Sequence, residues 1–336
     1  MPAPDILLEK LADDVLLRIR KRPEQPVSIA TLAHRFGASD DAVRAAADLL
    51  ISYGYRLKRK RDTLTYHSAP DCLLAAEITY GLKTKWLGHH IAAYNMVKST
   101  NDIAAQMAEE GTPHGTIVTA EQQTKGRGRL GRDWFSPPGT GIYVSMVLRP
   151  KFRPDRAPAL SIVTAVALAD SVSNYCPGQV KIKWPNDLLL SGKKTSGILT
   201  ELSAEGRHIN HVVIGVGINV NQGSGSFPEE IRHLATSLRR VARHKINRVE
   251  LLQLFLGHME KEYERYLKKG LSGHAPKVRR YSSLLGYTVS VRSGKNVITG
   301  QAVDIDDHGH LILEVDQRRL ALSAGEVTVV KSARPA

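Results

Sequence analysis

Apolar residues near the start of the chain recur at helical spacing. Over residues 5–21 they form one stripe, made of Ile6, Leu7, Leu11, Val15 and Ile19. Pro23 and Pro26 follow this stripe, and proline ends a helix because it has no N–H to donate. The pattern predicts a first helix that stops before Pro23.

Two further helices are predicted from capping residues as well as from periodicity. Ser28 is the predicted N-cap of a short helix over 29–36, and Gly37 follows it at a turn that needs positive φ. Ser39 is the predicted N-cap of the next helix, over 40–52. A short helix, a glycine turn and a capped second helix indicate a helix-turn-helix.

The following stretch, residues 54–68, is typical of a wing. Two β-leaning segments flank a turn near Arg61 and Asp62, and the basic residues are Arg56, Lys58, Arg59, Lys60 and Arg61. Such a wing can lie along the phosphates of DNA. Arg44, on the presumed recognition helix, is the candidate for reading a base. Acidic residues on the same helix (Asp40, Asp41 and Asp48) would repel phosphate. A helical bundle that binds a protein, or nothing, stays the alternative.

From His90 onward the pattern becomes mixed α/β. Apolar runs predict extended segments at 90–97, 116–121, 142–148, 180–183, 187–191, 195–203 and 211–220, and helices at 100–110, 156–175 and 248–269. Residues 286–330 predict short strands separated by turns, which suits a small β-barrel. The predicted fold class is α+β and multidomain, with domains over 1–68, 69–281 and 282–336.

Composition narrows the class of protein. The 336 residues suggest two or three domains at roughly 100–200 residues each. With 42% apolar and 24% charged residues, global disorder, collagen and coiled coil are excluded. Cys72 and Cys176 are too few and too far apart for a disulfide scaffold or a zinc knuckle. The acidic start lacks the basic and apolar pattern of a signal peptide, and the best apolar run, 157–169, is shorter than the ~20 residues of a membrane span. We expect a soluble, cytoplasmic protein with no membrane partner.

The net charge is strongly positive, because 47 Lys and Arg minus 33 Asp and Glu leaves +14. This balance fits a nucleic-acid partner, a nucleotide substrate or an acidic protein partner. Many basic domains bind no nucleic acid, so charge alone does not decide among them.

The most unusual segment is KGRGRLGR, residues 125–132. Glycine lets a backbone approach a ligand closely, and arginine offers planar, permanently charged donors for phosphate or carboxylate. The segment matches neither GxxxxGK[ST] nor GxGxxG. It should be mobile when empty and fold over an anionic ligand. On composition alone, a solvated loop or an RNA contact is an equal alternative.

Other motifs accompany this loop in a fixed order. They are KSTNDIA at 98–104, KWPND at 183–187, GKKTSGIL at 192–199 and GVGIN at 215–219. With the loop, they resemble the biotin–protein ligases. The resemblance runs from about 90 to 330. The added helix-turn-helix resembles the bifunctional form, which also represses the biotin operon.

The resemblance implies a fold and a chemistry. The central domain would be a mixed sheet with helices, related to class II aminoacyl-tRNA synthetases, and the C-terminal domain would be SH3-like. Biotin's carboxylate would attack the α-phosphate of Mg·ATP to give biotinyl-5′-AMP. A lysine of a biotin carboxyl carrier protein would then take the biotin. The implied partners also include operator DNA and a second copy of the chain, bound as a homodimer when the adenylate is present.

The resemblance assigns the first half of the site to three segments. Ser99, Thr100, Asn101 and Gln123 would bind the ureido ring, although a helix cap is the alternative for the first of these. Arg127, Gly128 and Arg129 would clamp biotin's carboxylate and the α-phosphate, and Arg132 would serve the outer phosphates. Trp134 would pack over the loop or near adenine, with a buried structural tryptophan as the alternative.

The second half of the site follows from the later motifs. Lys194 would stabilise charge between carboxylate and phosphate, assisted by Lys183. Asn186 would contact Mg²⁺ or phosphate, and Asp187 would orient the incoming ammonium. Gly215 and Gly217 would leave space for the biotin ring, and Asn219 would contact the adenylate. The alternative for WPND is an ordinary turn, and the alternative for the glycines is a buried strand with little room.

Two other functions stay open at this point. One is a winged-helix regulator that senses a ligand without ligase activity, in which Asp187 and Lys194 would be unnecessary. The other is a lipoate-type protein ligase, which shares the fold and the adenylation step. A metal hydrolase is poorly supported, because the 13 histidines are scattered and His89-His90 lies in no HExxH.

Overall fold

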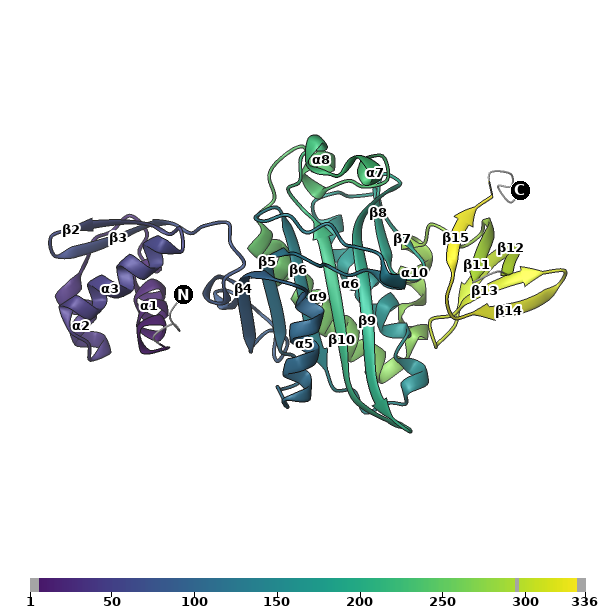
Figure 1. The fold of residues 1–336 in the computed structure, drawn as a ribbon, viewed down its shortest axis with the longest axis horizontal. Coiled ribbons are helices and arrows are strands. Elements are labelled where there is room, and N and C mark those ends of the chain that lie inside the picture. The colour runs from purple at the N-terminus through teal and green to yellow at the C-terminus, as the bar shows by residue number, and fades with distance from the viewer. Residues whose placement is uncertain (1–5, 294–295, 331–336) are drawn as a thin grey trace. The chain divides into compact units, whose positions relative to one another are not determined.

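The computed structural model describes residues 6–293 and 296–330. It divides into two compact units, Met1–Cys72 and Leu73–Ala336, drawn as a ribbon in Figure 1. The second unit contains both the central and the C-terminal domain that the sequence predicts, while the boundaries at 68 and 281 stay predictions. Within the described ranges, no helix is long and apolar enough to cross a membrane.

The N-terminal unit consists of three helices and a small sheet. Its elements are α1 (Ile6–Arg20), β1 (Val27–Ser28), α2 (Ile29–Phe36), α3 (Asp40–Ser52), β2 (Arg56–Lys60) and β3 (Thr63–Ser68), with the strands in the order β1-β3-β2. Both predicted caps are confirmed, because Ser28 Oγ accepts from Thr31 N and Ser39 Oγ accepts from Ala42 N. Gly37 has φ of +64°, so the turn between α2 and α3 uses the left-handed region as predicted.

A seven-stranded mixed sheet forms the centre of the second unit. Its order is β4-β5-β6-β10-β9-β8-β7, with only β4 and β5 parallel among its neighbouring pairs. The strands are β4 (Ile91–Val97), β5 (Ile117–Gln123), β6 (Gly141–Leu148), β7 (Val180–Lys183), β8 (Asp187–Leu190), β9 (Lys193–Glu205) and β10 (His208–Asn219).

Helices lie on both faces of this sheet. The helices of the second unit are α4 (Ala75–Thr79), α5 (Thr100–Glu109), α6 (Ala159–Ser173), α7 (Glu229–Arg232), α8 (Leu238–Ala242), α9 (Arg248–Lys269) and α10 (Ala275–Tyr281), with 3₁₀ turns at Arg129–Gly131, Pro154–Arg156, Ser224–Ser226 and Leu271–His274. In Figure 1, α5 lies on one face while α6 and α9 lie on the other. The predicted helix over 156–175 begins at Ala159, because a 3₁₀ turn and Pro158 precede it.

The C-terminal part of this unit is a five-stranded antiparallel sheet in the order β14-β13-β12-β11-β15. Its strands are β11 (Thr288–Ser293), β12 (Asn296–Ile305), β13 (Leu311–Val315), β14 (Arg318–Leu322) and β15 (Glu326–Val329). Its buried residues belong to the same hydrophobic cluster as α6 and α9. Trp184 Nε1 donates to Gly309 O at 2.8 Å, so the strand end that carries KWPND is attached to this sheet.

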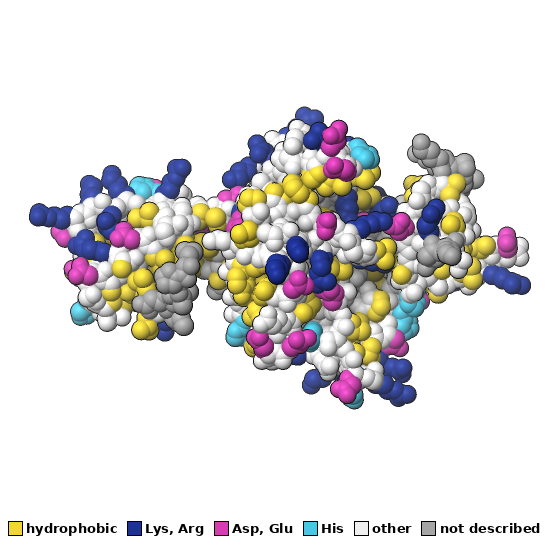
Figure 2. Space-filling model, in the orientation of Figure 1, with side chains coloured by type: hydrophobic (Ala, Val, Ile, Leu, Met, Phe, Trp, Pro, Cys, Tyr) yellow, Lys and Arg dark blue, Asp and Glu magenta, His cyan; other side chains and the backbone are white. Residues whose placement is uncertain are grey.

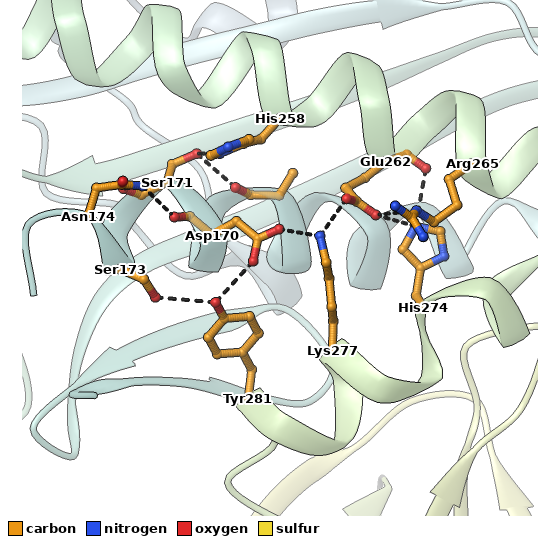
Figure 3. A network of polar contacts seen from close by, with 11 residues as sticks. Asp170, Ser171, Ser173, Asn174, His258, Glu262, Arg265, His274, Lys277 and Tyr281 are labelled. Carbon is orange, nitrogen blue, oxygen red and sulfur yellow. Dashed lines mark hydrogen bonds and ion pairs between the residues drawn. The ribbon is translucent and has the colours of Figure 1, made fainter. Parts of the chain in front are cut away.

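A polar network holds α10 against α6 and α9 (Figure 3). Lys277 Nζ lies 2.5 Å from Asp170 Oδ2 and 2.6 Å from Glu262 Oε1, and Tyr281 donates to Asp170 Oδ1. Burial alone would raise the pKa of Glu262, but hydrogen bonds from His274 and Lys277 outweigh it and lower this pKa to about 2. The network fixes the helix from which the chain enters the C-terminal sheet.

Candidate functional site

A cavity of about 440 Å³ opens beside the ends of β9 and β10 in the second unit. This volume lies within the range of small-molecule sites. Every site residue that the sequence predicts in this unit lines it: Ser99, Thr100, Asn101, Gln123, Arg127, Gly128, Arg129, Arg132, Trp134, Lys183, Asn186, Asp187, Lys194, Gly215, Gly217 and Asn219. Residues 325–328 of the C-terminal sheet line it too. The fold therefore collects motifs that are more than a hundred residues apart.

Thr100, Asn101 and Gln123 line one side of the cavity and belong to a hydrogen-bonded set that also includes the buried Ser145. We call these four residues the polar wall. Gln123 Oε1 accepts from Thr100 N at 2.8 Å and lies 3.1 Å from its hydroxyl. Ser145 Oγ donates to Asn101 Oδ1 at 2.6 Å and lies 2.8 Å from Thr100 Oγ1. Because these groups bond to one another, their orientations are set before a ligand arrives.

Ser99 stands next to the polar wall, at the N-terminus of α5. It is 2% exposed, and its side chain makes no capping hydrogen bond. Ser99 is therefore the N-cap residue of α5 by position, but its hydroxyl does not cap the helix. Its hydroxyl lines the cavity, where a polar ligand group can meet it.

Another part of the cavity lining comes from the arginine loop, residues 125–132. Its backbone forms a narrow turn, because Gly128 N donates to Arg132 O at 2.7 Å around the 3₁₀ turn. Arg127 Nη2 lies 2.6 Å from Asp102 Oδ1 and 3.0 Å from Glu201 Oε1. Arg132 forms an ion pair with Glu326 of β15. These two guanidinium groups thus contact carboxylates of the chain itself.

Arg129 differs from its neighbours in the arginine loop. Its Nη1 donates to Asn186 Oδ1 at 3.2 Å, which connects the loop to the KWPND turn. Burial lowers the pKa of its guanidinium, Asp187 raises it, and Arg132 lowers it. A partly desolvated guanidinium is a stronger electrostatic partner for an anion than one in water.

Lys194 and Asp187 form an ion pair at the floor of the cavity, with 2.7 Å between Nζ and Oδ1. Nζ also lies 5.5 Å from the centre of the Trp134 ring. The neighbouring turn is pinned to β9, because Asn186 and Ile198 exchange two hydrogen bonds of 2.9 Å. Lys183 stands opposite Asp187 in the β7–β8 register. A cation, a carboxylate and an amide are thus held together.

Gly215 and Gly217 make room for side chains of the protein. A Cβ atom at Gly215 would overlap the Asn101 amide, and one at Gly217 would overlap the Trp134 indole. The glycines were expected to leave space directly for the biotin ring, and here that space holds Asn101 and Trp134 instead. Asn219, 4% exposed, lies at the end of the same strand.

Several contributors to the site were missed from the sequence, among them Ser145, Glu201 and Glu326. Ser145 could have been found, since it is the single polar residue in the buried strand GIYVSMVL other than the tyrosine. Glu201, which accepts from Asn101 Nδ2 at 2.7 Å, and Glu326 lie in no motif. Their place in the site follows only from the tertiary fold.

The predicted DNA-contacting residues of the N-terminal unit are arranged in two groups. Arg56, Lys58 and Lys60 are exposed on β2. Arg59 instead lies 2.6 Å from Asp48 Oδ1 on α3, and Arg44 donates to Arg61 O at 2.8 Å with Asp62 nearby. Asp48 was expected to weaken phosphate contact, and here it pairs with an arginine of the hairpin.

Comparisons with known proteins agree with these motifs. The biotin/lipoate A/B protein ligase family matches residues 93–219, and the biotin protein ligase C-terminal domain matches 284–330. A bifunctional ligase/repressor BirA of Bacillus subtilis is 35% identical over 308 residues, which cover 91% of this chain and 95% of that protein. The chain belongs to the biotin protein ligase family.

Other family members give the same assignment. A biotin–[acetyl-CoA-carboxylase] ligase of Mycobacterium tuberculosis is 35% identical over 68% of this chain and 85% of its own. A solved biotin protein ligase of Aquifex aeolicus, in complex with biotin and ATP, has a TM-score of 0.62 at 29% identity, covering 73% of this chain and all of that one. The Bacillus match leaves 9% of this chain uncovered, less than the 72 residues of the N-terminal unit, so it must include part of that unit.

Proposed function

We propose that this family member activates biotin with ATP and transfers it to a lysine of a biotin carboxyl carrier protein. The observation that carries the proposal is the convergence of the polar wall, the arginine loop and the Lys194–Asp187 pair around one cavity. A neutral polar wall suits the ureido ring of biotin, whereas arginine and lysine suit a carboxylate and a phosphate. ATP and carrier proteins are found in the cytoplasm, where we expect the protein to act.

The first half-reaction joins biotin to AMP. A carboxylate oxygen of biotin attacks the α-phosphorus, the bond to the β-phosphate oxygen breaks, and pyrophosphate leaves. Arg129 and Lys194 face the region where negative charge grows, so they stabilise the transition state more than the ground state. Arg127 and Arg132 can exchange their carboxylate partners for ligand oxygens, because both side chains are largely exposed.

Mg²⁺ would enter bound to ATP, shielding the phosphate charge. Among the described residues, no group of three or more His, Cys, Asp or Glu side chains is placed to hold a metal. Mg²⁺ is commonly held by one or two protein oxygens together with substrate phosphates and water. Asn186 and Asp187 supply oxygens of this kind at the cavity.

The second half-reaction moves biotin to the acceptor lysine. The amine nitrogen attacks the carbonyl carbon of the mixed anhydride, the bond to the phosphate oxygen breaks, and AMP leaves. Asp187 attracts the incoming ammonium and is placed to take its proton. Its partner Lys194 lies 2.7 Å away and holds the carboxylate at the cavity.

Pyrophosphate release tests the ligase proposal. Purified protein with Mg·ATP should release pyrophosphate when biotin is added and not when lipoate is added. Calorimetry should show that biotin binds to the protein in the absence of ATP. Release with lipoate but not biotin would identify a lipoate-type ligase. Biotin binding without any pyrophosphate release would instead identify a ligand-sensing regulator.

We propose further that the N-terminal unit is a winged helix-turn-helix that represses biotin genes, and that residues 282–336 are an SH3-like barrel. Capped helices α2 and α3 around the Gly37 turn support the first assignment, as does the Bacillus relative named a ligase/repressor. Changing Lys58 and Lys60 to Gln should flatten the salt dependence of DNA binding by about one unit per lost phosphate contact. If the adenylate-bound protein fails to bind biotin-gene promoters even at low salt, the repressor proposal is wrong.

Dimerisation in the presence of biotinyl-AMP is part of the same proposal. Strand β4 is the edge of the seven-stranded sheet, and Tyr94 and Met96 on it are 40% and 59% exposed. A sheet edge with apolar side chains can pair with its twin in a two-fold contact. Sedimentation should show a monomer that becomes a dimer when the adenylate is added. An unchanged monomer would reject this proposal.

A further inference from the structure

A concentration of positive charge lies on α8 and the residue that follows it, shortly after the cavity-lining residues Leu234 and Ala235 in the chain. We call it the basic rim, and its members are three exposed arginines: Arg239, Arg240 and Arg243. No Asp or Glu occurs in the sequence between Glu230 and Glu250. In Figure 2, Lys and Arg side chains lie beside acidic side chains at the top of the view, where Figure 1 places α7 and α8.

Backbone hydrogen bonds attach the basic rim to the catalytic groups. Arg239 N donates to Val220 O at 2.8 Å, directly after β10. The segment just before α8 runs beside Lys194, because Lys194 N donates to Leu234 O and Thr236 N donates to Lys194 O. Leu234 lines the cavity and is 56% exposed. The basic rim thus begins five residues after an exposed apolar side chain that lines the cavity.

The folded chain itself gains little from these charges. The N-cap of α8 is Ser237, whose hydroxyl accepts from Arg240 N, so no arginine side chain is needed to begin the helix. Arg243 even takes φ of +64°, a conformation that favours glycine or asparagine. Exposed like charges within one short segment repel each other in the absence of a partner. An anionic partner would remove that repulsion.

We propose that the basic rim binds an acidic surface on the carrier domain, next to its acceptor lysine. This inference rests on the proposed ligase function and adds a docking surface to it. The acceptor amine must reach the anhydride beside Lys194, so the carrier's surface must meet the cavity edge during every turnover. Leu234 would supply an apolar centre and the basic rim a charged periphery, as in protein interfaces generally. Complementary charge would raise the association rate.

The test removes three charges from the rim and compares a matched control. The rim variant carries Arg239→Gln, Arg240→Gln and Arg243→Asn, with asparagine chosen because it accepts positive φ. The control variant carries Lys261→Gln, Lys268→Gln and Lys269→Gln, three exposed cations of α9 that do not line the cavity. The probes are an apo biotin carrier domain of negative net charge and the same domain with acidic residues near its acceptor lysine changed to amides.

The expected result separates docking from chemistry. In the rim variant, KM for the acidic carrier should rise about tenfold at low ionic strength, and the difference should shrink in high salt. Its kcat and its biotin-dependent pyrophosphate release should match the parent, and the amide carrier should bind both proteins alike. The control variant should behave like the parent with either carrier.

Other outcomes would overturn the inference. An unchanged KM in the rim variant, or an equal rise in the control variant, would show that the rim does not bind the carrier. A loss of DNA binding with an unchanged KM would assign the rim to nucleic acid instead. Absence of pyrophosphate release in the parent would contradict the proposed function itself, which the carrier measurement alone would not.

Discussion

The polar wall and the arginine loop line the same cavity, but their contacts differ in kind. The polar wall is buried, and its members bond mainly to neutral groups of neighbouring strands and helices: Ser145 is fully buried and Asn101 is 4% exposed. In the arginine loop, Arg127 and Arg132 are exposed and contact carboxylates. The positions of the polar-wall side chains are therefore fixed by packing and neutral hydrogen bonds, whereas those of Arg127 and Arg132 are fixed by ion pairs.

This difference teaches how the two substrates can be handled. Buried neutral hydrogen bonds are costly to break, so the polar wall keeps one geometry and selects by shape. Exposed ion pairs contribute little to stability, so Asp102 and Glu326 can give up their arginines to a phosphate at small cost. We therefore expect the arginine loop to change its contacts when the ligand binds, and the polar wall to keep the same geometry with and without the ligand.

The largest effect on activity is expected from a change at Lys194, which lines the same cavity as the polar wall and the arginine loop. Lys194→Ala should reduce pyrophosphate release by about 10²–10³-fold, since it removes a preorganised charge from the reacting centre. Biotin binding by calorimetry should be largely kept. The exposed neighbour gives the control, and Lys193→Ala should retain activity. An equal loss of binding and activity in Lys194→Ala would indicate a structural lysine.

A smaller effect is expected from Arg129→Gly, which tests whether the loop responds to its ligand. The change removes a charged contact to the ligand and the hydrogen bond to Asn186, and it adds backbone freedom. Adenylation should slow by about 10–10²-fold, a typical range for a lost charged contact. Biotinyl-AMP should also escape faster, measured as labelling of unrelated lysines in an added protein. If the variant retains the adenylate as tightly as the parent, the loop is not a lid.

The polar wall should fail differently, by losing stability and binding together. Asn101→Ala removes bonds to Ser145 and Glu201 and leaves buried groups unpaired, so unfolding should become easier by about 1–3 kcal/mol. Biotin affinity should fall in parallel in calorimetry. Gln106→Ala, on the exposed side of the same helix, is the control and should change neither. A weaker affinity with unchanged urea unfolding would show that the wall is not preorganised by these bonds.

The smallest effect on the site is expected from a change outside the polar wall and the arginine loop. Lys277→Met removes the cation shared by Asp170 and Glu262, and should cost about 1–2 kcal/mol in urea unfolding, less than a fully buried pair because the lysine is partly exposed. Biotin binding should be unchanged.

The pH dependence of that cost follows from Glu262. Its pKa in the folded protein, about 2, lies below its ordinary value of 4.5. Its contribution to stability is therefore complete above about pH 4.5 and is lost as the pH falls toward 2. The difference between parent and Lys277→Met should shrink over this pH window. A difference that stays constant with pH would show that Glu262 is not the group stabilised by Lys277.

How much the sequence predicts depends on how local the cause is. The caps at Ser28 and Ser39 and the turn at Gly37 were predicted to the residue, because a cap is decided by side chains within three positions. The strands of the mixed sheet were located to within a few residues for the same reason, since apolar runs mark them. Motifs then identified the cavity-lining residues without predicting their contacts.

The contacts themselves required the fold. Whether Gly217 faces a ligand or Trp134 depends on residues 83 positions apart in the sequence. The pairing of Arg132 with Glu326 joins two domains that the sequence predicts separately. Nothing in the sequence near either residue indicates that the other is its partner. Ser99 occupies the N-cap position of α5 without capping it by its side chain, and the sequence does not determine the direction in which a hydroxyl points.

Residues 325–328 line the cavity together with residue 99, so the site spans most of the polypeptide. During synthesis the N-terminal unit can fold as soon as it emerges, whereas the binding site cannot be complete until residue 328 has left the ribosome. Domains generally fold in order from the N-terminus, and long-range contacts form late. A growing chain would thus carry a finished N-terminal unit while its ligand site is still open.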